Sequence, residues 1–304
     1  MALGLVKSLH GTAFINGSWV DAHDGSTFEV TNPADETVIA EVANCGEEET
    51  KQAINAAVEA LPVWSALPAE QKSSILRKWF ELISANIEEL AELLTLEQGK
   101  PIAEARAEIA YGASYIEWFA EEAKRIYGDT IPAPGPDKRI ITLKQPVGVV
   151  ACITPWNFPN AMLTRKIAPA LAAGCTVVCK PANETPLSAL ILADYALKAG
   201  IPDGVINILC GKTNEIGETL TASKDVRKLT FTGSTAVGKK LAADCAKTMK
   251  RTTMELGGNA PFLIFGDADI DSAVSGLMAS KFRNSGQTCV CANRILVEDQ
   301  IYEQ

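Results

Sequence analysis

Two residues near the end of the chain, Glu255 and Cys289, have side chains that together could perform covalent chemistry. Glu255 stands in the run MELGGNAP, and Cys289 follows 289 − 255 = 34 residues later in the polar, glycine-containing setting NSGQTC. A covalent catalyst of this kind needs a thiol that substrate can reach and a base that completes turnover. Most other cysteines stand in apolar runs such as GCTVVC and VINILC, which are typical of strand interiors. Taken alone, such a pair is more often a surface carboxylate and an inert, half-buried cysteine.

Histidine is nearly absent, which narrows the chemistry. The chain has two histidines, His10 and His23, both far upstream of Glu255 and Cys289. A Cys–His protease or a Ser–His–Asp hydrolase would need one of them as its base. A nucleophile here must therefore work with a carboxylate or without a dedicated base.

Length and composition exclude several classes of protein. A chain of 304 residues with 47% hydrophobic content favours two domains, or one domain and part of another. The net charge of −9 and the pI near 5.0 argue against a nucleic-acid surface or a face for anionic membranes. Eight cysteines without paired zinc spacing favour a reducing compartment. The N-terminus has no signal-peptide core, and the most apolar run, residues 167–179, is too short to span a bilayer. We therefore expect a soluble cytoplasmic protein.

The middle of the chain alternates short apolar runs with helical patterns. This alternation predicts right-handed βαβ units and a parallel sheet with both faces covered. Upstream, Asn16-Gly17 predicts a hairpin turn, helices are expected at residues 69–96 and 102–127, and an exposed strand at residues 139–145. The expected strands of the sheet are residues 147–153, 176–179, 205–209, 228–231 and 251–254, and the helices between them are residues 161–173, 187–199, 216–222 and 236–249.

Unusual residues follow three of these strands, where open parallel sheets bind ligands. In TPWNFP, Trp156 offers a flat apolar wall and Asn157 an amide that could stabilise an oxyanion. In KPANETP, Lys180 suits a ribose or a phosphate. In FTGSTAVG, Gly233 and Ser234 open a helix whose N–H groups could bind phosphate. Each motif alone also fits a plain structural use, namely a rigid loop, an exposed strand-end lysine or a serine cap.

Together the motifs resemble a known family. TPWNFP, KPANETP, FTGSTAVG, ELGGNAP and GQTC, in this order and spacing, are similar to those of the aldehyde dehydrogenase superfamily over essentially the whole chain. The runs LTRKIAPALAAG and KFRNSGQTCVCANR resemble its succinate-semialdehyde dehydrogenases. The resemblance implies an α/β fold: a Rossmann-like parallel-sheet cofactor domain and the beginning of a second α/β catalytic domain. We expect the first at residues 1–254, including an N-terminal helical region and a bridging strand segment near 128–146, and the second at residues 255–304.

The resemblance also implies roles for individual residues. Cys289 would add to an aldehyde as the nucleophile, and Asn157 with the Cys289 backbone N–H would hold the oxyanion of the thiohemiacetal. Hydride would leave to NADP or NAD, and water activated by Glu255 would hydrolyse the thioester. No metal is implied. The cofactor would be contacted by Trp156, Lys180, Asn183, Gly233, Ser234 and Leu256.

Substrate choice would depend on two arginines. Arg165 follows the TPWNFP loop, and Arg283 lies six residues before Cys289, that is 289 − 283 = 6. Guanidinium groups at the far end of the pocket would bind the carboxylate of an aldehyde acid. The expected reaction is oxidation of succinate semialdehyde to succinate, and the alternatives are another aldehyde such as glutarate semialdehyde, or plain surface arginines.

Three features depart from the family pattern or leave alternatives open. Asn183 stands where NAD-preferring members often have a glutamate, with the acid displaced to Glu184, which favours tolerance of NADP. Family members continue well past Gln304, so we expect a fragment or truncated product, with an inactive nucleotide-binding fragment as the alternative. The resemblance implies that the full-length form is a homo-oligomer, a dimer or tetramer. Cys291 could be a redox partner of Cys289 or a small buried side chain.

Overall fold

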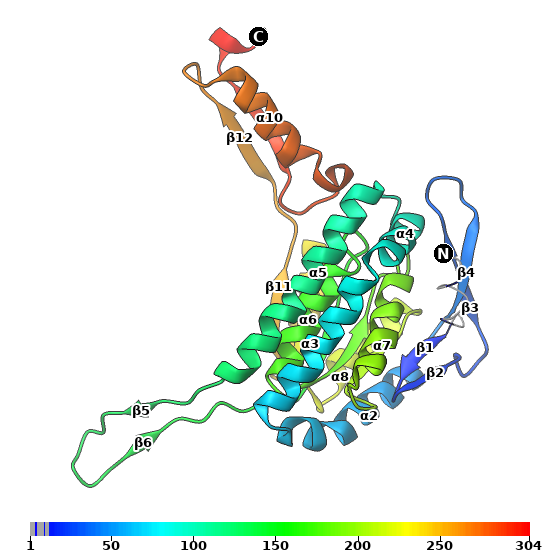
Figure 1. Ribbon diagram of the computed structural model, residues 1–304, viewed down its shortest axis with the longest axis vertical. Coiled ribbons are helices and arrows are strands. Elements are labelled where there is room, and N and C mark those ends of the chain that lie inside the picture. The colour runs from blue at the N-terminus through cyan, green and yellow to red at the C-terminus, as the bar shows by residue number, and fades with distance from the viewer. Residues whose placement is uncertain (1–3, 5–8, 10–11) are drawn as a thin grey trace.

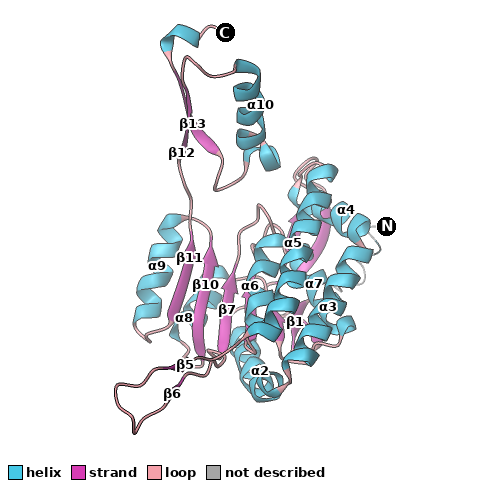
Figure 2. Cartoon of the chain, turned by 60° about the vertical axis from the view of Figure 1, so that its left-hand side comes forward, coloured by secondary structure: helices cyan, strands magenta, loops and turns pink. Residues whose placement is uncertain are grey.

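A seven-stranded sheet forms the centre of the larger part of the molecule (Figure 2). The computed structural model describes residues 4, 9 and 12–304. His10, one of the two histidines, lies outside the described residues. The strand order is β11-β10-β7-β8-β9-β1-β2, and the first five strands are parallel, which confirms the predicted α/β fold. The parallel strands are β7 (Val149–Ile153), β8 (Thr176–Lys180), β9 (Ile206–Ile208), β10 (Val226–Thr232) and β11 (Arg251–Glu255).

Helices cover the two faces of this sheet in layers. On one face α6 and α7 contact the strands, and α3, α4 and α5 form a further layer on top of them (Figure 1). On the other face lie α2, α8 and α9. Within residues 4, 9 and 12–304, no helix combines the length and the apolar character needed to cross a membrane. The helices are α2 (Glu47–Ala66), α3 (Ala69–Ala85), α4 (Ile87–Gln98), α5 (Ile102–Glu122), α6 (Ala161–Ala172), α7 (Leu187–Ala199), α8 (Thr213–Ala222) and α9 (Thr235–Ala246).

The helical layer corrects two sequence predictions. The single helix predicted for residues 69–96 is two helices, because Asn86 has φ −116° and ends α3. The amide of Asn86 donates to the carbonyl oxygen of Leu82 at 2.8 Å, a bond that competes with helix continuation. The helix predicted for residues 102–127 ends at Glu122 and continues only as the 3₁₀ turn η1 (Ala123–Arg125).

The N-terminal hairpin joins the main sheet. β1 (Ala13–Ile15) and β2 (Ser18–Val20) meet at Asn16 and Gly17, whose φ angles of 52° and 74° confirm the predicted turn. β1 also pairs antiparallel with β9 through Phe14 and Ile208, which extends the parallel sheet by two strands. A separate antiparallel pair follows, β3 (Thr27–Thr31) and β4 (Val38–Ala43).

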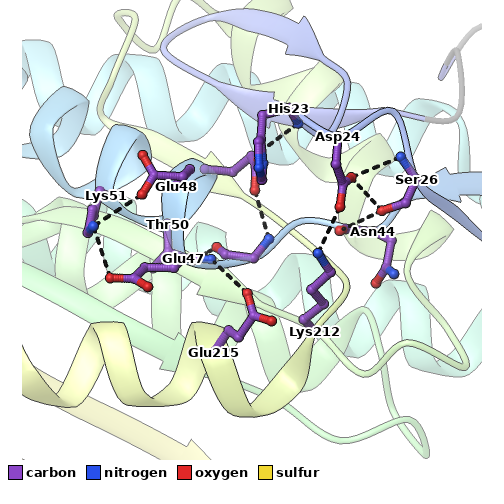
Figure 3. A network of polar contacts seen from close by, with 12 residues as sticks. His23, Asp24, Ser26, Asn44, Glu47, Glu48, Thr50, Lys51, Lys212 and Glu215 are labelled. Atoms are coloured by element: carbon purple, nitrogen blue, oxygen red, sulfur yellow. Dashed lines mark hydrogen bonds and ion pairs between the residues drawn. The ribbon is translucent and has the colours of Figure 1, made fainter.

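A polar network attaches the segment after β2 to the helices beneath it (Figure 3). The Glu49 carboxylate accepts from the backbone N–H of His23 at 2.7 Å and contacts its ring nitrogen Nδ1 at 2.9 Å. Lys212, at the start of α8, donates to Asp24 at 2.9 Å, and Ser26 donates to the same carboxylate. These contacts of His23 and Asp24 hold the segment after β2 against α2 and α8.

The expectation that both faces of the sheet are covered is wrong for β11. β7 and β8 are almost completely buried, but most of β11 is exposed. β11 is at the end of the strand order, and α9 is the described helix that packs against it. Its sequence, Arg-Thr-Thr-Met-Glu, suits an edge position better than a core strand.

Two parts project from this body (Figure 1). The first is a hairpin arm made by β5 (Thr130–Ile131) and β6 (Ile140–Ile141), with exposed side chains at Ile131, Ile141 and Leu143. The strand predicted at residues 139–145 is thus only two residues long. The second is a C-terminal unit in which β12 (Ala260–Ile264) and β13 (Ala292–Val297) pair in parallel. α10 (Ile270–Lys281), η2 (Arg283–Gly286) and η3 (Asp299–Ile301) complete this unit.

Candidate active site

A cavity of about 310 Å³ lies at the carboxyl ends of β7, β10 and β11, where the body meets the C-terminal unit. Its walls come from the loop after β7, the start of α9, the end of β11 and the segment after η2. All the residues that were expected to act in catalysis or to contact the cofactor or substrate line it, except Lys180 and Asn183. These lining residues are Trp156, Asn157, Arg165, Gly233, Ser234, Glu255, Leu256, Arg283 and Cys289.

Cys289 is the exposed cysteine among eight free cysteines, and the other seven are buried. The turn before it, at Asn284, Ser285 and Gly286, has three consecutive positive φ angles of 55°, 56° and 78°. This left-handed backbone reverses the chain and delivers Cys289 to the cavity wall. Local sequence therefore indicated the accessible thiol correctly.

Cys291 lies in a different environment from Cys289. Its side chain is fully buried, and its thiol donates to the carbonyl oxygen of Lys281 at 3.2 Å and contacts the Thr288 hydroxyl. This geometry fits the small buried side chain, one of the two interpretations of Cys291 that the sequence left open.

Asn157 is held on both its main chain and its side chain. Its carbonyl oxygen accepts from Lys100 Nζ at 2.8 Å and from Asn284 Nδ2 at 2.9 Å. Its own Nδ2 donates to the carbonyl oxygen of Gln287 at 2.7 Å. The orientation of the Asn157 amide at the cavity is therefore fixed by the segment that leads to Cys289.

Glu255 is the last residue of β11, and its exposed side chain lines the cavity. Its carbonyl oxygen accepts from the backbone N–H of Gly233 at 3.1 Å, which ties the end of β11 to the start of α9. Glu255 also lines an adjacent cavity of about 430 Å³, together with Lys166 of α6. The Lys166 ammonium donates to Thr230 at 3.0 Å, and burial lowers its pKa to about 8.

The start of α9 opens on the cavity. Ser234 is the N-cap of this helix, and its hydroxyl accepts from the backbone N–H of Val237 at 3.4 Å, so the structural use of this serine is present. A Cβ at Gly238 would lie 2.5 Å from Cδ2 of Leu256, so the glycine allows Leu256 to pack there. The hydroxyl of Thr232 at the cavity wall is buried and has no partner in the described part of the chain.

Each arginine at the cavity lies over an aromatic ring. Cζ of Arg165 is 5.5 Å from the ring centroid of Tyr115, and Cζ of Arg283 is 5.7 Å from that of Phe158. Burial, with the contact to the Tyr111 hydroxyl, raises the pKa of Tyr115 to about 12. The ring under Arg165 is thus a neutral phenol, and cation–π attraction helps to hold the guanidinium in place.

Lys180 and Asn183 lie outside the cavity walls. Lys180 ends β8 and is buried, and its ammonium donates to the carbonyl oxygen of Pro181 and to Asn183 Oδ1, both at 3.0 Å. Burial lowers the pKa of Lys180. Asn183 Nδ2 donates to the carbonyl oxygen of Gly211 at 2.8 Å and therefore joins the loops after β8 and β9. Asn183 lines a further cavity of about 460 Å³. Trp156 lines this cavity and also the 310 Å³ cavity that contains Cys289.

Sequence reasoning missed a buried ion pair beneath the site. Lys100 and Glu108 contact each other with both side chains fully buried. The Glu108 carboxylate accepts from the backbone N–H groups of Asn160 at 2.9 Å and Ala161 at 3.2 Å, at the start of α6. Burial raises the pKa of Glu108 and lowers that of Lys100, and the ion pair opposes both shifts. Lys100 stands in the connection between α4 and α5 and Glu108 within α5, and neither position shows a local sign of burial, so only the contact reveals them.

Comparison of the chain with protein families gives one match over most of its length. The family model described as "Aldehyde dehydrogenase family" matches residues 19–304. The chain belongs to the aldehyde dehydrogenase family. Its α/β fold and the sequence resemblance are both confirmed by this match.

Individual relatives add detail to the family assignment. The chain is 57% identical to the glutarate-semialdehyde dehydrogenase of Pseudomonas aeruginosa, over all of this chain and 63% of that protein. It is 58% identical to the NADP(+) succinate-semialdehyde dehydrogenase of Escherichia coli K12, over 96% of this chain and 61% of that protein. A crystal structure of betaine aldehyde dehydrogenase from Staphylococcus aureus in complex with NAD+ superposes with TM-score 0.96 at 35% identity, covering 99% of this chain and 60% of that one. The chain spans about three-fifths of the length of the curated relatives it matches.

Proposed function

We propose that this aldehyde dehydrogenase oxidises an aldehyde that also has a carboxylate, succinate semialdehyde to succinate, with NADP or NAD as hydride acceptor. The observation that supports this most directly is one cavity lined by an exposed thiol, a fixed amide and two guanidinium groups, at Cys289, Asn157, Arg165 and Arg283. Because the chain spans about three-fifths of its curated relatives, the activity is proposed for the protein with its complete catalytic domain.

The reaction begins at sulfur. The Cys289 thiolate forms a bond to the aldehyde carbon, and the carbonyl oxygen becomes an oxyanion. Asn157 Nδ2 and the Cys289 backbone N–H donate to that oxyanion, where preorganised donors stabilise the transition state. After oxidation the acyl group remains on sulfur as a thioester. Glu255 takes a proton from water, the resulting hydroxide attacks the thioester carbon, and the carboxylic acid leaves as the thiolate is restored.

The dinucleotide supplies the hydride acceptor when it is bound. The residues present fit such a group. The start of α9 offers backbone donors beside Ser234, Trp156 and Leu256 provide apolar walls, and the Thr232 hydroxyl is a buried group that lacks a partner in the described residues. Lys180 and Asn183 would reach the adenosine ribose or its 2′-phosphate. Asn183 places no carboxylate beside a 2′-phosphate, which supports use of NADP.

The arginines support a substrate with a second anionic group. Arg165 and Arg283 are both held over aromatic rings at the cavity and have no carboxylate partner among the ion pairs of the described chain. A substrate carboxylate would supply the missing charge. Two chain lengths fit this chemistry, and the relatives include enzymes named for each, so glutarate semialdehyde is the second candidate substrate.

We also propose that the protein is a homo-oligomer in the cytoplasm. The β5–β6 arm projects with exposed apolar side chains, which supports a subunit contact in a homodimer or homotetramer. The eight free cysteines support a reducing, cytoplasmic environment.

The decisive experiment measures NAD(P)H absorbance with succinate semialdehyde and glutarate semialdehyde. It compares the 304-residue chain with a longer version that has the rest of a family catalytic domain, each beside Cys289→Ala. Cys291→Ser serves as the matched control, because it changes the buried neighbour and leaves the exposed thiol. We expect activity in the longer version that is lost with Cys289→Ala and kept with Cys291→Ser. Activity that survives Cys289→Ala would refute the mechanism, and nucleotide binding without any turnover would favour the inactive binding fragment.

A further inference from the structure

The backbone carbonyl oxygen of Asn157 is a shared acceptor for two distant parts of the chain. Lys100 reaches it at 2.8 Å from the connection between α4 and α5. Asn284 reaches it at 2.9 Å from η2, in the segment that leads to Cys289. A single main-chain atom therefore joins the loop after β7, the helical layer and the C-terminal unit.

The Lys100 side of this contact is rigid. Lys100 pairs with Glu108, and its ammonium also lies 4.4 Å from the ring centroid of Phe158, the residue after Asn157. Glu108 in turn binds the backbone N–H groups at the start of α6. Because removing either partner of a buried pair leaves an uncompensated charge, this side is anchored to the fold itself.

The Asn284 side depends on one amide in an unusual backbone conformation. Asn284 is buried and has φ 55°, a region that asparagine tolerates better than most residues. Its backbone N–H donates to Glu104 of α5 at 2.7 Å, which fixes the turn to the helical layer. Its Nδ2 donates to Asn157 O at 2.9 Å, and Asn157 Nδ2 donates back to Gln287 O at 2.7 Å. The loop after β7 and the segment before Cys289 are thus joined by hydrogen bonds in both directions.

We infer that Asn284 is a positioning residue for the oxyanion site, which acts by holding Asn157 against the segment that bears Cys289. The inference rests on the proposed function, in which Asn157 Nδ2 and the Cys289 backbone N–H bind the same oxygen. Those two donors come from different loops, and the bonds from Asn284 Nδ2 to Asn157 O and from Asn157 Nδ2 to Gln287 O set the distance between them. A misplacement of about 1 Å at a reacting centre can lower a rate about 100-fold.

Two substitutions distinguish the contribution of the Asn284 side-chain amide from that of its left-handed backbone conformation. Asn284→Asp keeps the size and the tolerance of positive φ but replaces the donating NH₂ with an acceptor. Asn284→Gly accommodates φ 55° without strain but has no side chain. Asn214→Asp, the same chemical change at an exposed position of α8, is the matched control. If the left-handed turn alone mattered, Asn284→Gly would behave as wild type, and that outcome would overturn the inference.

The kinetic test is a double-mutant cycle with Asn157→Ala in the longer, active version. Asn284→Asp is expected to lower kcat about 10–100-fold with little change in KM. Added to Asn157→Ala, it should cause no further loss, because the Asn157 amide it positions is gone. A full second loss in the double variant would mean that Asn284 stabilises the fold independently, which contradicts a positioning role.

A second measurement needs no turnover. Hydrogen–deuterium exchange of the 304-residue chain should show faster exchange at residues 154–160 as well as at 284–291 in Asn284→Asp, and wild-type exchange in Asn214→Asp. Unchanged exchange at residues 154–160 would overturn the inference even if activity falls. If the wild type proves unable to oxidise aldehydes, the proposed function fails, and the exchange data still decide whether Asn284 holds the two loops together.

Discussion

Gly233 donates its backbone N–H to the carbonyl oxygen of Glu255 at 3.1 Å. This bond joins the end of β10 to the end of β11 and brings the start of α9 beside the Glu255 carboxylate. It also engages the N–H of Gly233, a residue that the family resemblance expects to contact the cofactor. Among the N–H groups near the start of α9 that could bind a phosphate, that of Gly233 is therefore already engaged.

The close packing of α9 on Leu256 predicts the effect of adding one methyl group. A Cβ at Gly238 would meet Leu256 Cδ2 at 2.5 Å, so Gly238→Ala should displace Leu256 from the cavity wall. Overpacking of this kind costs about 1–3 kcal/mol, and we expect NADPH binding to weaken about tenfold or more. Fluorescence titration and urea unfolding would measure the two effects.

Gly217→Ala is the matched control for that substitution. Gly217 lies inside α8, and a Cβ there would meet no atom within 4 Å. Alanine should stabilise this helix by about 0.5–1 kcal/mol and leave NADPH binding unchanged. Equal binding losses in the two variants would contradict the role given to the Gly238–Leu256 contact.

Arg165 should discriminate between charged and uncharged aldehydes. Arg165→Gln removes a guanidinium held over Tyr115, and a hydrogen bond to a charged group contributes about 1.5–3 kcal/mol. The KM for succinate semialdehyde should rise about 10–100-fold, while the KM for butanal, which has no carboxylate, should stay near the wild-type value. Arg251→Gln, an exposed arginine at the start of β11, is the control. An equal rise for both aldehydes in Arg165→Gln would show a general loss of structure.

Asn183 provides a test of cofactor preference. Asn183→Glu places a carboxylate near the adenosine end expected for the cofactor, and repulsion of a 2′-phosphate should shift the ratio of kcat/KM values for NADP and NAD toward NAD. The substitution also removes the bond from Asn183 Nδ2 to Gly211, so Asn183→Gln serves as a neutral control. If both variants change the ratio equally, or Asn183→Glu leaves it unchanged, charge at this position does not set the preference.

Lys166 should make stability depend on pH in the alkaline range. Burial lowers its folded-state pKa from 10.5 to about 8. Below pH 8 the folded and unfolded chains both hold the proton, and the cost of burying the charge is fully present. Between pH 8 and 10.5 the folded chain releases the proton while the unfolded chain keeps it, so the free energy of unfolding should rise with pH, by at most about 1.4 kcal/mol per pH unit.

Urea unfolding on both sides of pH 8 checks this prediction. Lys166→Met should be more stable than wild type at neutral pH and should lack the alkaline rise, because the buried charge is removed. Lys239→Met, on the exposed face of α9, should keep the wild-type profile. A Lys166→Met profile parallel to wild type would assign the alkaline behaviour to other groups.

The amino-acid sequence by itself determined the parallel sheet and the residues at the ends of its strands. The expected segments coincide with β7 to β11 and α6 to α9 to within a few residues, because continuous apolar runs and helical periodicity are local properties. The same holds for the hairpin at Asn16 and Gly17 and for the accessible thiol at Cys289. The order of the motifs further indicated that Asn157, Glu255 and Cys289 would meet at one edge of the sheet.

Tertiary structure alone decided how those residues are held. Lys100 and Asn157 are 57 residues apart, and Asn157 and Asn284 are 127 apart, so no local pattern could pair them. The exposure of β11, the pairing of β1 with β9 and the use of Gly233 N–H within the sheet likewise depend on which strands become neighbours. A buried polar group takes whichever partner the completed fold brings within hydrogen-bond distance, and that choice is made in space after the local elements have formed.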